Sequence, residues 1–423
     1  MDNNIINFDD VIFADLHIHS RFSRACSSNL TFENLVKWAK IKGLNLLGTG
    51  DFTHPIWLNE IKAKLIEKDG FYYYNDFPFI ISGEISLMYS QEGPVGTNFT
   101  SEIRRGRRIH LLMLVPNIEI ADKINAYLDT KGRRDYDGRP IFKISGEEFV
   151  REMMKISKDI EIIPAHCWTP WFGIFGSASG FDSLKECFKE QIENVHAIET
   201  GMSSDPEMNW RIKELENKSI VSFSDAHSFW PFRLGREATI FKKTDFYKEI
   251  IEQIRNNTFV ATIETDPAYG KYHWDGHRAC KFSCEPNKTK ELKEICPVCK
   301  KQLTIGVENR IERLAYYPKG FRAKNEKPFY RLLPLQEVIA LAVGSGLESK
   351  SVWQVYNLLI ENFENEFNIL LNVSREEFLK KNVDIKLADL IIKNREEKIK
   401  IKPGYDGEYG KAVIGIGERQ AIL

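Results

Sequence analysis

The stretch Val11-Ile12-Phe13-Ala14-Asp15-Leu16-His17-Ile18-His19 joins a short apolar run to a pair of imidazoles. Residues i and i+2 of a strand point to the same face, so His17 and His19 are expected to lie side by side. Other short apolar runs within residues 1–262 also end in a side chain able to bind metal. These ends are Asp51, Glu84, His166, Glu199, Asp225 and His227. His110 belongs to the same set, although it begins its apolar run.

The apolar runs predict the strands of a single sheet. We expect strands at 11–19, 44–51, 79–84, 109–115, 160–166, 195–200, 220–227 and 238–241. Helix-like segments such as 31–42, with Thr31 as a candidate N-cap, and 185–191 separate most of them. This alternation is typical of an α/β protein with a mainly parallel sheet and helices outside. Roughly seven or eight strands suit a closed or distorted β/α barrel, whose chemistry lies at the C-terminal strand ends.

Length and charge limit the classes of protein that fit. The chain has 423 residues, which predicts two or three domains at about 150 residues each. The formal net charge of -1 gives no sign of a nucleic-acid or membrane partner. No apolar run approaches the roughly 18 residues that a membrane span needs. Met1–Asn4 has no signal-peptide character, so we expect a cytoplasmic protein.

Composition divides the chain into three predicted domains. We expect a barrel at 1–262, a zinc-ribbon module at 263–333 and an α-helical C-terminal domain at 334–423. The last domain is expected to hold helices at 335–343, 351–363, 374–380 and 387–398. The tail Lys402–Gly410 is turn-rich and is not expected to be helical.

A cluster of cysteines marks the middle domain. The cluster consists of Cys280, Cys284, Cys296 and Cys299. The pair Cys296-Pro297-Val298-Cys299 has the usual two-residue knuckle spacing, whereas the first pair has one residue more. Four thiolates suit one structural zinc ion with tetrahedral geometry. His273 and His277, just before the cluster, are alternative ligands, although a structural or DNA-facing role is favoured for them.

The strand-end residues resemble the successive motifs of the polymerase-and-histidinol-phosphatase (PHP) superfamily. The matching segments are Asp15–Ser20, Gly50-Asp51, Gly83-Glu84, His110, His166 and Ser224–His227. The resemblance implies a distorted (β/α)7 barrel that holds two or three divalent ions and hydrolyses phosphoesters. Zinc, manganese and magnesium are the candidate ions. Two ions bridged by a carboxylate would lower the pKa of a shared water toward about 7 and clamp a phosphoryl oxygen.

The same resemblance implies a role for each metal-binding residue. It assigns one ion to His17, His19, Glu84 and Asp225, a second to Glu84, His110 and His166, and a third to His227 near Asp51. The implied catalytic residues are Asp51, Glu84, Asp225 and His227. Two departures weaken the third site. Phe52 stands where the family usually has a His, and Ser23–Cys26 lacks a second expected His. His54 or Asp51 would have to compensate.

Two further segments are predicted to contact DNA. Arg104, Arg105, Arg107 and Arg108 directly precede His110, and guanidinium groups are suited to bidentate phosphate contacts. The alternative is a solvated charged loop. The loop 168–180 follows His166 and mixes aromatic residues with glycines, which suits base stacking. Its predicted DNA-binding residues are Trp168, Trp171, Phe172, Ser177 and Ser179. The alternative is a buried loop plug.

Taken together, the barrel, ribbon and helical region resemble the endonuclease Q family of DNA-repair enzymes. Matching stretches include Gly48–Asp51, Trp168–Gly180, Glu199–Pro206, Leu234–Ala238 and Tyr272–Arg278. The resemblance implies hydrolysis of the phosphodiester 5′ of a deaminated base (uracil, hypoxanthine, xanthine) or an abasic site. Damaged DNA is then the partner, no membrane is involved, and a sliding clamp remains open as a second partner.

A nuclease of this kind must reach a base that the duplex hides. The damaged base is expected to flip into a pocket between the barrel loops, the zinc module and the helical region. Two other functions stay open. One is a PHP-type phosphatase or phosphodiesterase acting on a small phosphoester, and the other is a DNA-binding or scaffold protein with an inactive barrel.

Overall fold

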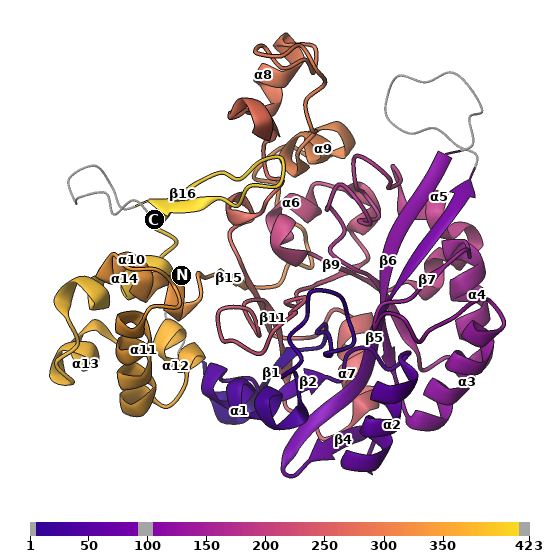
Figure 1. The fold of residues 1–423 in the computed structure, drawn as a ribbon, viewed down its shortest axis with the longest axis horizontal. Coiled ribbons are helices and arrows are strands. Elements are labelled where there is room, and N and C mark those ends of the chain that lie inside the picture. The colour runs from indigo at the N-terminus through magenta and orange to yellow at the C-terminus, as the bar shows by residue number, and fades with distance from the viewer. Residues whose placement is uncertain (1–5, 92–104, 414–423) are drawn as a thin grey trace.

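The computed structural model describes residues 6–91 and 105–413 (Figure 1). At its centre lies a mixed sheet of 11 strands. Its path runs through β15 (Phe329–Arg331), β12 (Ala261–Glu264), β11 (Ala238–Lys242), β1 (Val11–Asp15), β2 (Leu46–Gly48), β5 (Phe77–Gln91), β4 (Phe71–Tyr74) and β3 (Ile66–Lys68). From β5 the sheet continues through β6 (Arg105–Val115) to β8 (Glu161–Pro164), and the short β7 (Ile141–Phe142) also pairs with β5.

The sequence predicted a mainly parallel sheet, but the observed sheet is mixed. The pairs β1–β2 and β2–β5 are parallel, but β6 runs antiparallel to both β5 and β8, and β11 runs antiparallel to β1. Because β6 runs opposite to β5 and β8, His110 lies across from Ser86 of β5 and just beyond the pairing of Leu111 with Pro164, the last residue of β8. This explains why His110 begins its apolar run while the other candidate ligands follow theirs.

Within residues 6–262, two of the described strands lie outside the main sheet. β9 (Ala197–Glu199) and β10 (Ser219–Val221) form a separate parallel pair. The chain after β10 returns to β1 through an isolated bridge between Ile18 and Ala226, in which the His19 N–H donates to the Ala226 carbonyl over 2.9 Å. This return places the segment after β10 beside the two histidines that follow β1.

Helices cover the outer side of the sheet (Figure 1). They are α1 (Phe32–Lys42), α2 (Pro55–Lys64), α3 (Ile118–Asp129), α4 (Gly146–Ile156), α5 (Leu184–Phe188) and α7 (Tyr247–Arg255). The predicted cap of α1 is confirmed, because the Thr31 side chain accepts the N–H of Asn34. In β1, Phe13 packs into one apolar core while Ile12 and Ala14 pack into another, as strand alternation requires.

The cysteine-rich segment projects from the top of the view in Figure 1. It contains the hairpin of β13 (Asp275–His277) and β14 (Phe282–Cys284), followed by α8 (Pro286–Glu291) and α9 (Val307–Leu314). Nearby lies the short α6 (Pro206–Trp210), which comes from the barrel region. The chain then returns to the main sheet as β15, which pairs with β12. The segment 263–333 therefore contributes both the projecting module and a strand of the central sheet.

The C-terminal region is helical, as predicted, and gathers on one side of the sheet (Figure 1). It comprises α10 (Leu335–Val343), α11 (Lys350–Phe363), α12 (Glu366–Leu371), α13 (Arg375–Lys380) and α14 (Ile385–Arg395). The prediction missed α12, a six-residue helix capped by the Asn365 side chain. The tail forms a small hairpin of β16 (Lys400–Lys402) and β17 (Lys411–Val413).

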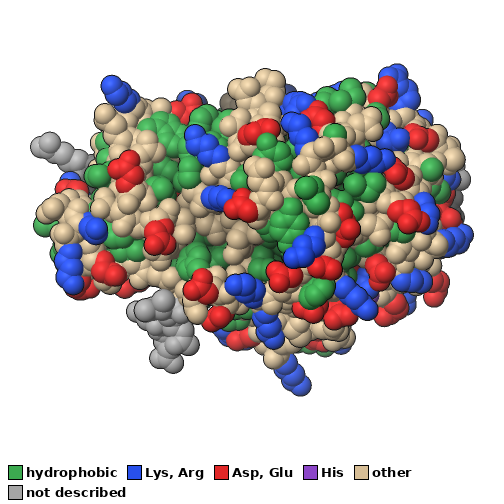
Figure 2. Space-filling model, turned by 90° about the horizontal axis from the view of Figure 1, so that it is seen from below, with side chains coloured by type: hydrophobic (Ala, Val, Ile, Leu, Met, Phe, Trp, Pro, Cys, Tyr) green, Lys and Arg blue, Asp and Glu red, His purple; other side chains and the backbone are tan. Residues whose placement is uncertain are grey.

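The surface is mixed in charge on the face seen in Figure 2. Lysine and arginine side chains there are interspersed with acidic and apolar ones. This distribution agrees with the nearly balanced charge of the chain. Among the described helices, none combines the length and apolarity needed to cross a membrane.

Candidate metal centre

Four predicted ligands converge beside the end of β1. One ligand atom from each of His17, His19, Glu84 and Asp225 lies within 4.8 Å of the others. The His19 Nε2 atom is 2.9 Å from Asp225 Oδ1 and 3.3 Å from Glu84 Oε2. The His17 Nε2 atom is 3.6 Å from each of these two oxygens. Two imidazoles and two carboxylates at this spacing are a suitable donor set for zinc or manganese.

A second group shares Glu84 with the first. One ligand atom from each of Glu84, His110 and His166 lies within the same 4.8 Å limit. Here Glu84 Oε1 is 2.8 Å from His110 Nδ1 and 3.0 Å from His166 Nε2. The two oxygens of Glu84 thus face different groups, with Oε2 toward His17 and His19. This is the geometry of a carboxylate that bridges two ions.

Two further carboxylates orient the histidines from behind. Glu199 Oε1 lies 2.8 Å from His17 Nδ1, and Glu199 Oε2 accepts the backbone N–H of His166 over 2.7 Å. Asp51 Oδ1 lies 2.9 Å from His19 Nδ1. A partner on one ring nitrogen fixes the tautomer, so the other nitrogen is free to bind metal. The sequence offered Glu199 as a strand-end carboxylate but gave no sign of this orienting role.

The structure does not gather the predicted third metal site within the described residues. Asp51 Oδ2 accepts hydrogen bonds from the Ser20 N–H, the Ser20 hydroxyl and the Ser23 hydroxyl at 2.6, 2.7 and 2.9 Å. With Oδ1 on His19, both Asp51 oxygens are occupied by protein donors. The His227 ring is tilted against the His19 ring, with centroids 4.5 Å apart, and its Nδ1 lies 2.9 Å from the Asp225 carbonyl oxygen. In this structure Asp51 contacts His19, Ser20 and Ser23, and its ligand role stays a prediction.

His54 does not compensate for the missing imidazole. Its side chain is buried at the start of α2, and its ring stacks on Phe22 at 4.2 Å. Burial lowers the pKa of His54, which agrees with a neutral ring in an apolar setting. His54 is part of the packing beneath the site.

The charges within the centre favour cation binding. Burial alone lowers the pKa of His17, but the carboxylates of Glu199 and Glu84 outweigh it and hold that pKa well above its usual value. Burial alone raises the pKa of Glu84, yet the nearby His110, Arg139 and His17 hold it well below its usual range. The direction for Glu84 favours an ionised carboxylate in the pocket, a charge that suits a divalent cation.

Arg139 is a member of the centre that the sequence prediction missed. Its Nη1 donates to Glu84 Oε2 over 2.9 Å. The residue comes from an irregular loop after α3, without an apolar run to mark it. The sequence Asp137-Gly138-Arg139-Pro140 is typical of a turn, and it could have indicated that a loop presents the Arg139 side chain.

The predicted arginine run contributes less than expected. Arg104 and the side chain of Arg105 lie outside the described residues. Arg107 is buried, where it donates to the Gly180 carbonyl and, over 2.5 Å, to Glu186 Oε1, with its guanidinium 4.1 Å from the Phe181 ring centroid. Arg108 is exposed. Arg107 and Arg108 lie on β6, where successive side chains point to opposite faces, so Arg107 packs inward and the DNA contact of the exposed Arg108 stays a prediction.

The loop 168–180 combines a buried part with an exposed tip. Trp168 is buried and donates from its indole nitrogen to Asn209 Oδ1 over 2.7 Å, so it is not available to DNA. Trp171 is 43% exposed and lies 5.5 Å from the Tyr272 ring. Phe172 covers the His110 ring at 4.3 Å.

The two serines of this loop have structural partners. The Ser177 hydroxyl donates to the Ile305 carbonyl over 3.0 Å, and the Ser179 hydroxyl donates to the Arg108 carbonyl over 3.4 Å. Both bonds fasten the loop to neighbouring segments. Trp171 is therefore the member of the predicted set whose position best suits contact with a base.

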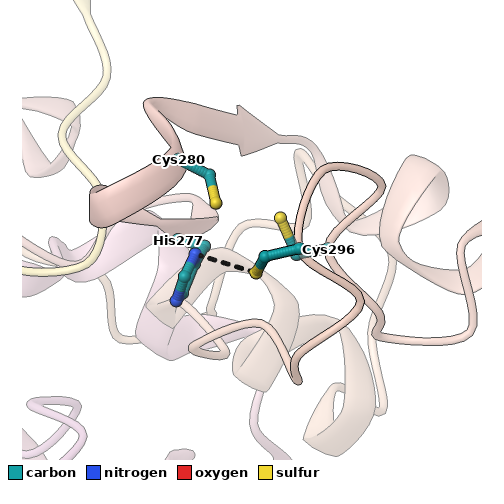
Figure 3. Close-up of side chains that lie close together, drawn as sticks. His277, Cys280 and Cys296 are labelled. Carbon is teal, nitrogen blue, oxygen red and sulfur yellow. Dashed lines mark hydrogen bonds between the residues drawn. The ribbon is translucent and has the colours of Figure 1, made fainter.

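The cysteine cluster differs from the predicted four-thiolate set. The atoms that converge within 4.8 Å belong to His277, Cys280, Cys296 and Cys299. The labelled side chains of His277, Cys280 and Cys296 point toward one another (Figure 3), and the Cys299 sulfur lies 3.5 Å from His277 Nδ1. Cys284 instead contacts the Thr289 hydroxyl at 3.3 Å.

The register of the β13–β14 hairpin explains why His277, and not Cys284, joins the other three cysteines. His277 pairs with Phe282, whereas Cys284 pairs with Asp275 two positions farther along, about 7 Å away. The signal was present in the sequence, because His277-Arg278-Ala279-Cys280 has the two-residue spacing that Cys280 and Cys284 lack. Three cysteines and one histidine form a common closed zinc site.

A cavity of about 360 Å³ opens where the three parts of the chain meet. Its walls come from the α6 region, the 266–273 segment, α9 and the end of the C-terminal helices. Lining residues include Asp205, Met208, His273, Arg331, Asn394 and Glu397. A volume of this size is typical of a ligand pocket.

Comparison with known proteins gives two structures that match nearly the whole chain. One is the crystal structure of the lesion-specific endonuclease PfuEndoQ from Pyrococcus furiosus, with 30% identity and a TM-score of 0.83 over 96% of this chain and 95% of that one. The other is endonuclease Q in complex with a 27-mer duplex substrate that has an abasic lesion at the active site. It gives the same identity and TM-score over 96% of this chain and 97% of that one.

Sequence comparison adds two partial matches. The family model of the MJ0043 C-terminal domain matches residues 334–398. The uncharacterized protein MJ0043 of Methanocaldococcus jannaschii is 34% identical over 252 residues, which are 58% of this chain and 31% of that protein. The aligned part thus spans less than a third of MJ0043.

The shared fold and the near-complete structural matches place the chain in the class of nucleases. Within that class it belongs to the endonuclease Q family.

Proposed function

We propose that this protein is a metal-dependent DNA-repair endonuclease that hydrolyses the phosphodiester 5′ of a deaminated base or an abasic site. The observation that carries the proposal is Glu84, whose two oxygens face two separate groups of metal-binding side chains. The neighbouring structures support it, since one is a lesion-specific endonuclease and the other holds an abasic duplex at its active site.

The donor set fits two divalent ions. His17, His19, Glu84 and Asp225 would hold one, and Glu84, His110 and His166 the other. Zinc, manganese or magnesium bound there would supply an activated water at neutral pH and neutralise charge on the phosphoryl oxygens. The protein itself fixes the imidazole tautomers through Glu199 and Asp51, and it shields His110 from solvent with the Phe172 ring.

A phosphatase acting on a small phosphoester is the alternative. Such an enzyme needs no projecting metal module and no helical domain, whereas both suit a macromolecular substrate. The sliding clamp considered as a second partner has no support in either structural match, and it is not part of the proposal.

The deciding experiment offers both substrate classes to the same protein. Duplex DNA with one deoxyuridine, deoxyinosine or abasic site is incubated with the protein and Mg²⁺, Mn²⁺ or Zn²⁺, beside a panel of small phosphomonoesters. We expect a nick 5′ of the lesion and no cut in undamaged duplex. Phosphate release from the monoesters, with intact lesion duplex, would establish the phosphatase instead.

The cavity beside α6 is the proposed pocket for the flipped base. It lies between barrel loops, the cysteine-rich module and the helical region, and it has room for a purine. None of the residues of the loop 168–180 lines this cavity. Trp171 contacts Tyr272, which is the sequence neighbour of the lining residue His273.

Filling this pocket is expected to separate two kinds of lesion. Met208→Trp should lower nicking at deoxyinosine at least about tenfold, because the added ring occupies the space of the base, whereas an abasic site has no base to place. Met208→Ala, which enlarges the pocket, serves as the matched control. Initial nicking rates on the two duplexes give the readout. Equal losses at both lesions would rule the cavity out as the base pocket.

Zinc binding in the ribbon is expected to follow the observed geometry. His277→Ala should lose the structural zinc and destabilise the module, since structural zinc contributes folding free energy directly. Cys284→Ser should keep the ion, because its sulfur contacts Thr289 outside the converging set. Zinc per chain, measured by native mass spectrometry, distinguishes them. Loss of zinc in Cys284→Ser with retention in His277→Ala would restore the four-cysteine set.

A further inference from the structure

A guanidinium also contacts the carboxylate that the two groups share. Arg139 Nη1 lies 2.9 Å from Glu84 Oε2, the oxygen that also faces His17 and His19. The Arg139 side chain is 25% exposed, so it reaches both the centre and the solvent. An arginine side chain is effectively always protonated in a protein, so the group carries a positive charge.

The loop that carries Arg139 is fixed against the site. The Gly138 N–H donates to the Phe22 carbonyl over 3.0 Å, and the Ser86 N–H donates to the Pro140 carbonyl over 3.0 Å. A Cβ atom at position 138 would collide with the Asp51 carboxylate and the Ser23 hydroxyl. Glycine therefore allows the loop to approach the residues behind His19, and this approach directs the next residue into the centre.

Once metal ions bind, Glu84 can no longer serve as the hydrogen-bond partner of the Arg139 guanidinium. Both Glu84 oxygens are then required as metal ligands, and the added positive charge repels Arg139 from them. The anion that enters the centre during the reaction is the phosphodiester. Arginine offers several N–H donors in a planar fork that matches phosphate oxygens.

We propose that Arg139 is a substrate-binding residue that contacts a non-bridging oxygen of the scissile phosphodiester and stabilises the charge that develops there. The inference rests on the proposed function, because it assigns a phosphodiester to this site. It goes further by giving the site a cationic contact from the protein itself, outside the arginine run that directly precedes His110.

The test compares Arg139→Ala and Arg139→Lys with Arg24→Ala. Arg24 is the matched control, because it contacts the same loop through Asp137 at 3.3 Å but is 82% exposed and stays outside the centre. On abasic duplex at saturating Mn²⁺, Arg139→Ala should lose about 100- to 1000-fold in kcat, the effect of removing one donor to a developing oxyanion. Arg139→Lys should lose less, and Arg24→Ala should stay near wild type.

Two further readouts separate substrate contact from support of Glu84. Added guanidinium ion should partly restore nicking by Arg139→Ala, and Mn²⁺ affinity measured by calorimetry should change little. A lowered Mn²⁺ affinity without rescue would show that Arg139 only positions Glu84 and would overturn the inference, as would an unchanged kcat. Failure of the wild-type protein to nick any lesion duplex would instead reject the proposed function.

Discussion

Glu84→Gln is expected to reduce nicking of abasic duplex at least about a thousandfold. Both oxygens of Glu84 are in use, Oε1 toward His110 and His166 and Oε2 toward His19 and His17. Glutamine keeps one oxygen and turns an amide toward the other group, so one ion loses a ligand and the bridge is lost. Two metal ions at such a centre stabilise the transition state by several kcal/mol, and each 1.36 kcal/mol of lost stabilisation lowers the rate about tenfold.

A second buried glutamate provides the control. Glu161 on β8 is fully buried like Glu84, but it contacts His196 and Arg255, away from the two groups. Glu161→Gln should retain nicking in the folded fraction. Single-turnover rates and bound metal per chain are measured together. A Glu84→Gln protein that kept more than about a tenth of the rate would contradict the bridging role.

Lys42→Met is expected to lower the free energy of unfolding by about 3–5 kcal/mol. Lys42 is the last residue of α1, and its Nζ donates to Glu366 Oε1 over 2.6 Å and to the Pro231 carbonyl over 2.8 Å. Glu366 also accepts from the Leu335 N–H and the Tyr356 hydroxyl, both in the C-terminal helices. Both charges are buried, so removing one leaves the other without compensation.

Lys40→Met on the same helix is the control. Lys40 pairs with Asp76 at 3.0 Å, but the two side chains are 51% and 77% exposed, and such pairs contribute roughly 0–1 kcal/mol. Urea denaturation followed by circular dichroism gives both free energies. Similar losses for the two variants would show that the buried pair does not hold the C-terminal helices to the sheet.

The sequence pointed to most of the side chains that converge in the candidate centre because their signal is local. His17 and His19, two residues apart just beyond the end of β1, fall into one group with Glu84 and Asp225, and His166 follows β8. Alternation did not reveal which carboxylates bind and which orient. Asp51 and Glu199 look like Glu84 in sequence, and their roles depend on which side of a histidine ring they contact.

The remaining differences arise from long-range contacts. Arg139 comes from a turn whose path is set by Phe22, Ser86 and Asp51. The buried position of Arg107 is set by the pairing of β6 with β5, which no local sequence pattern predicts. The direction of β6 itself depends on a long hairpin, so a parallel barrel was the wrong expectation for that part of the sheet.

The most direct test of the central claim is nicking by metal-free protein that is refilled in steps. The protein is stripped with a chelator under conditions that spare the ribbon zinc, and Mn²⁺ is then added from zero to several ions per chain. We predict no nicking before addition, and a nick 5′ of the abasic site that grows with occupancy and levels off near two ions per barrel. Full nicking by the stripped protein, with metal content verified, would contradict the account.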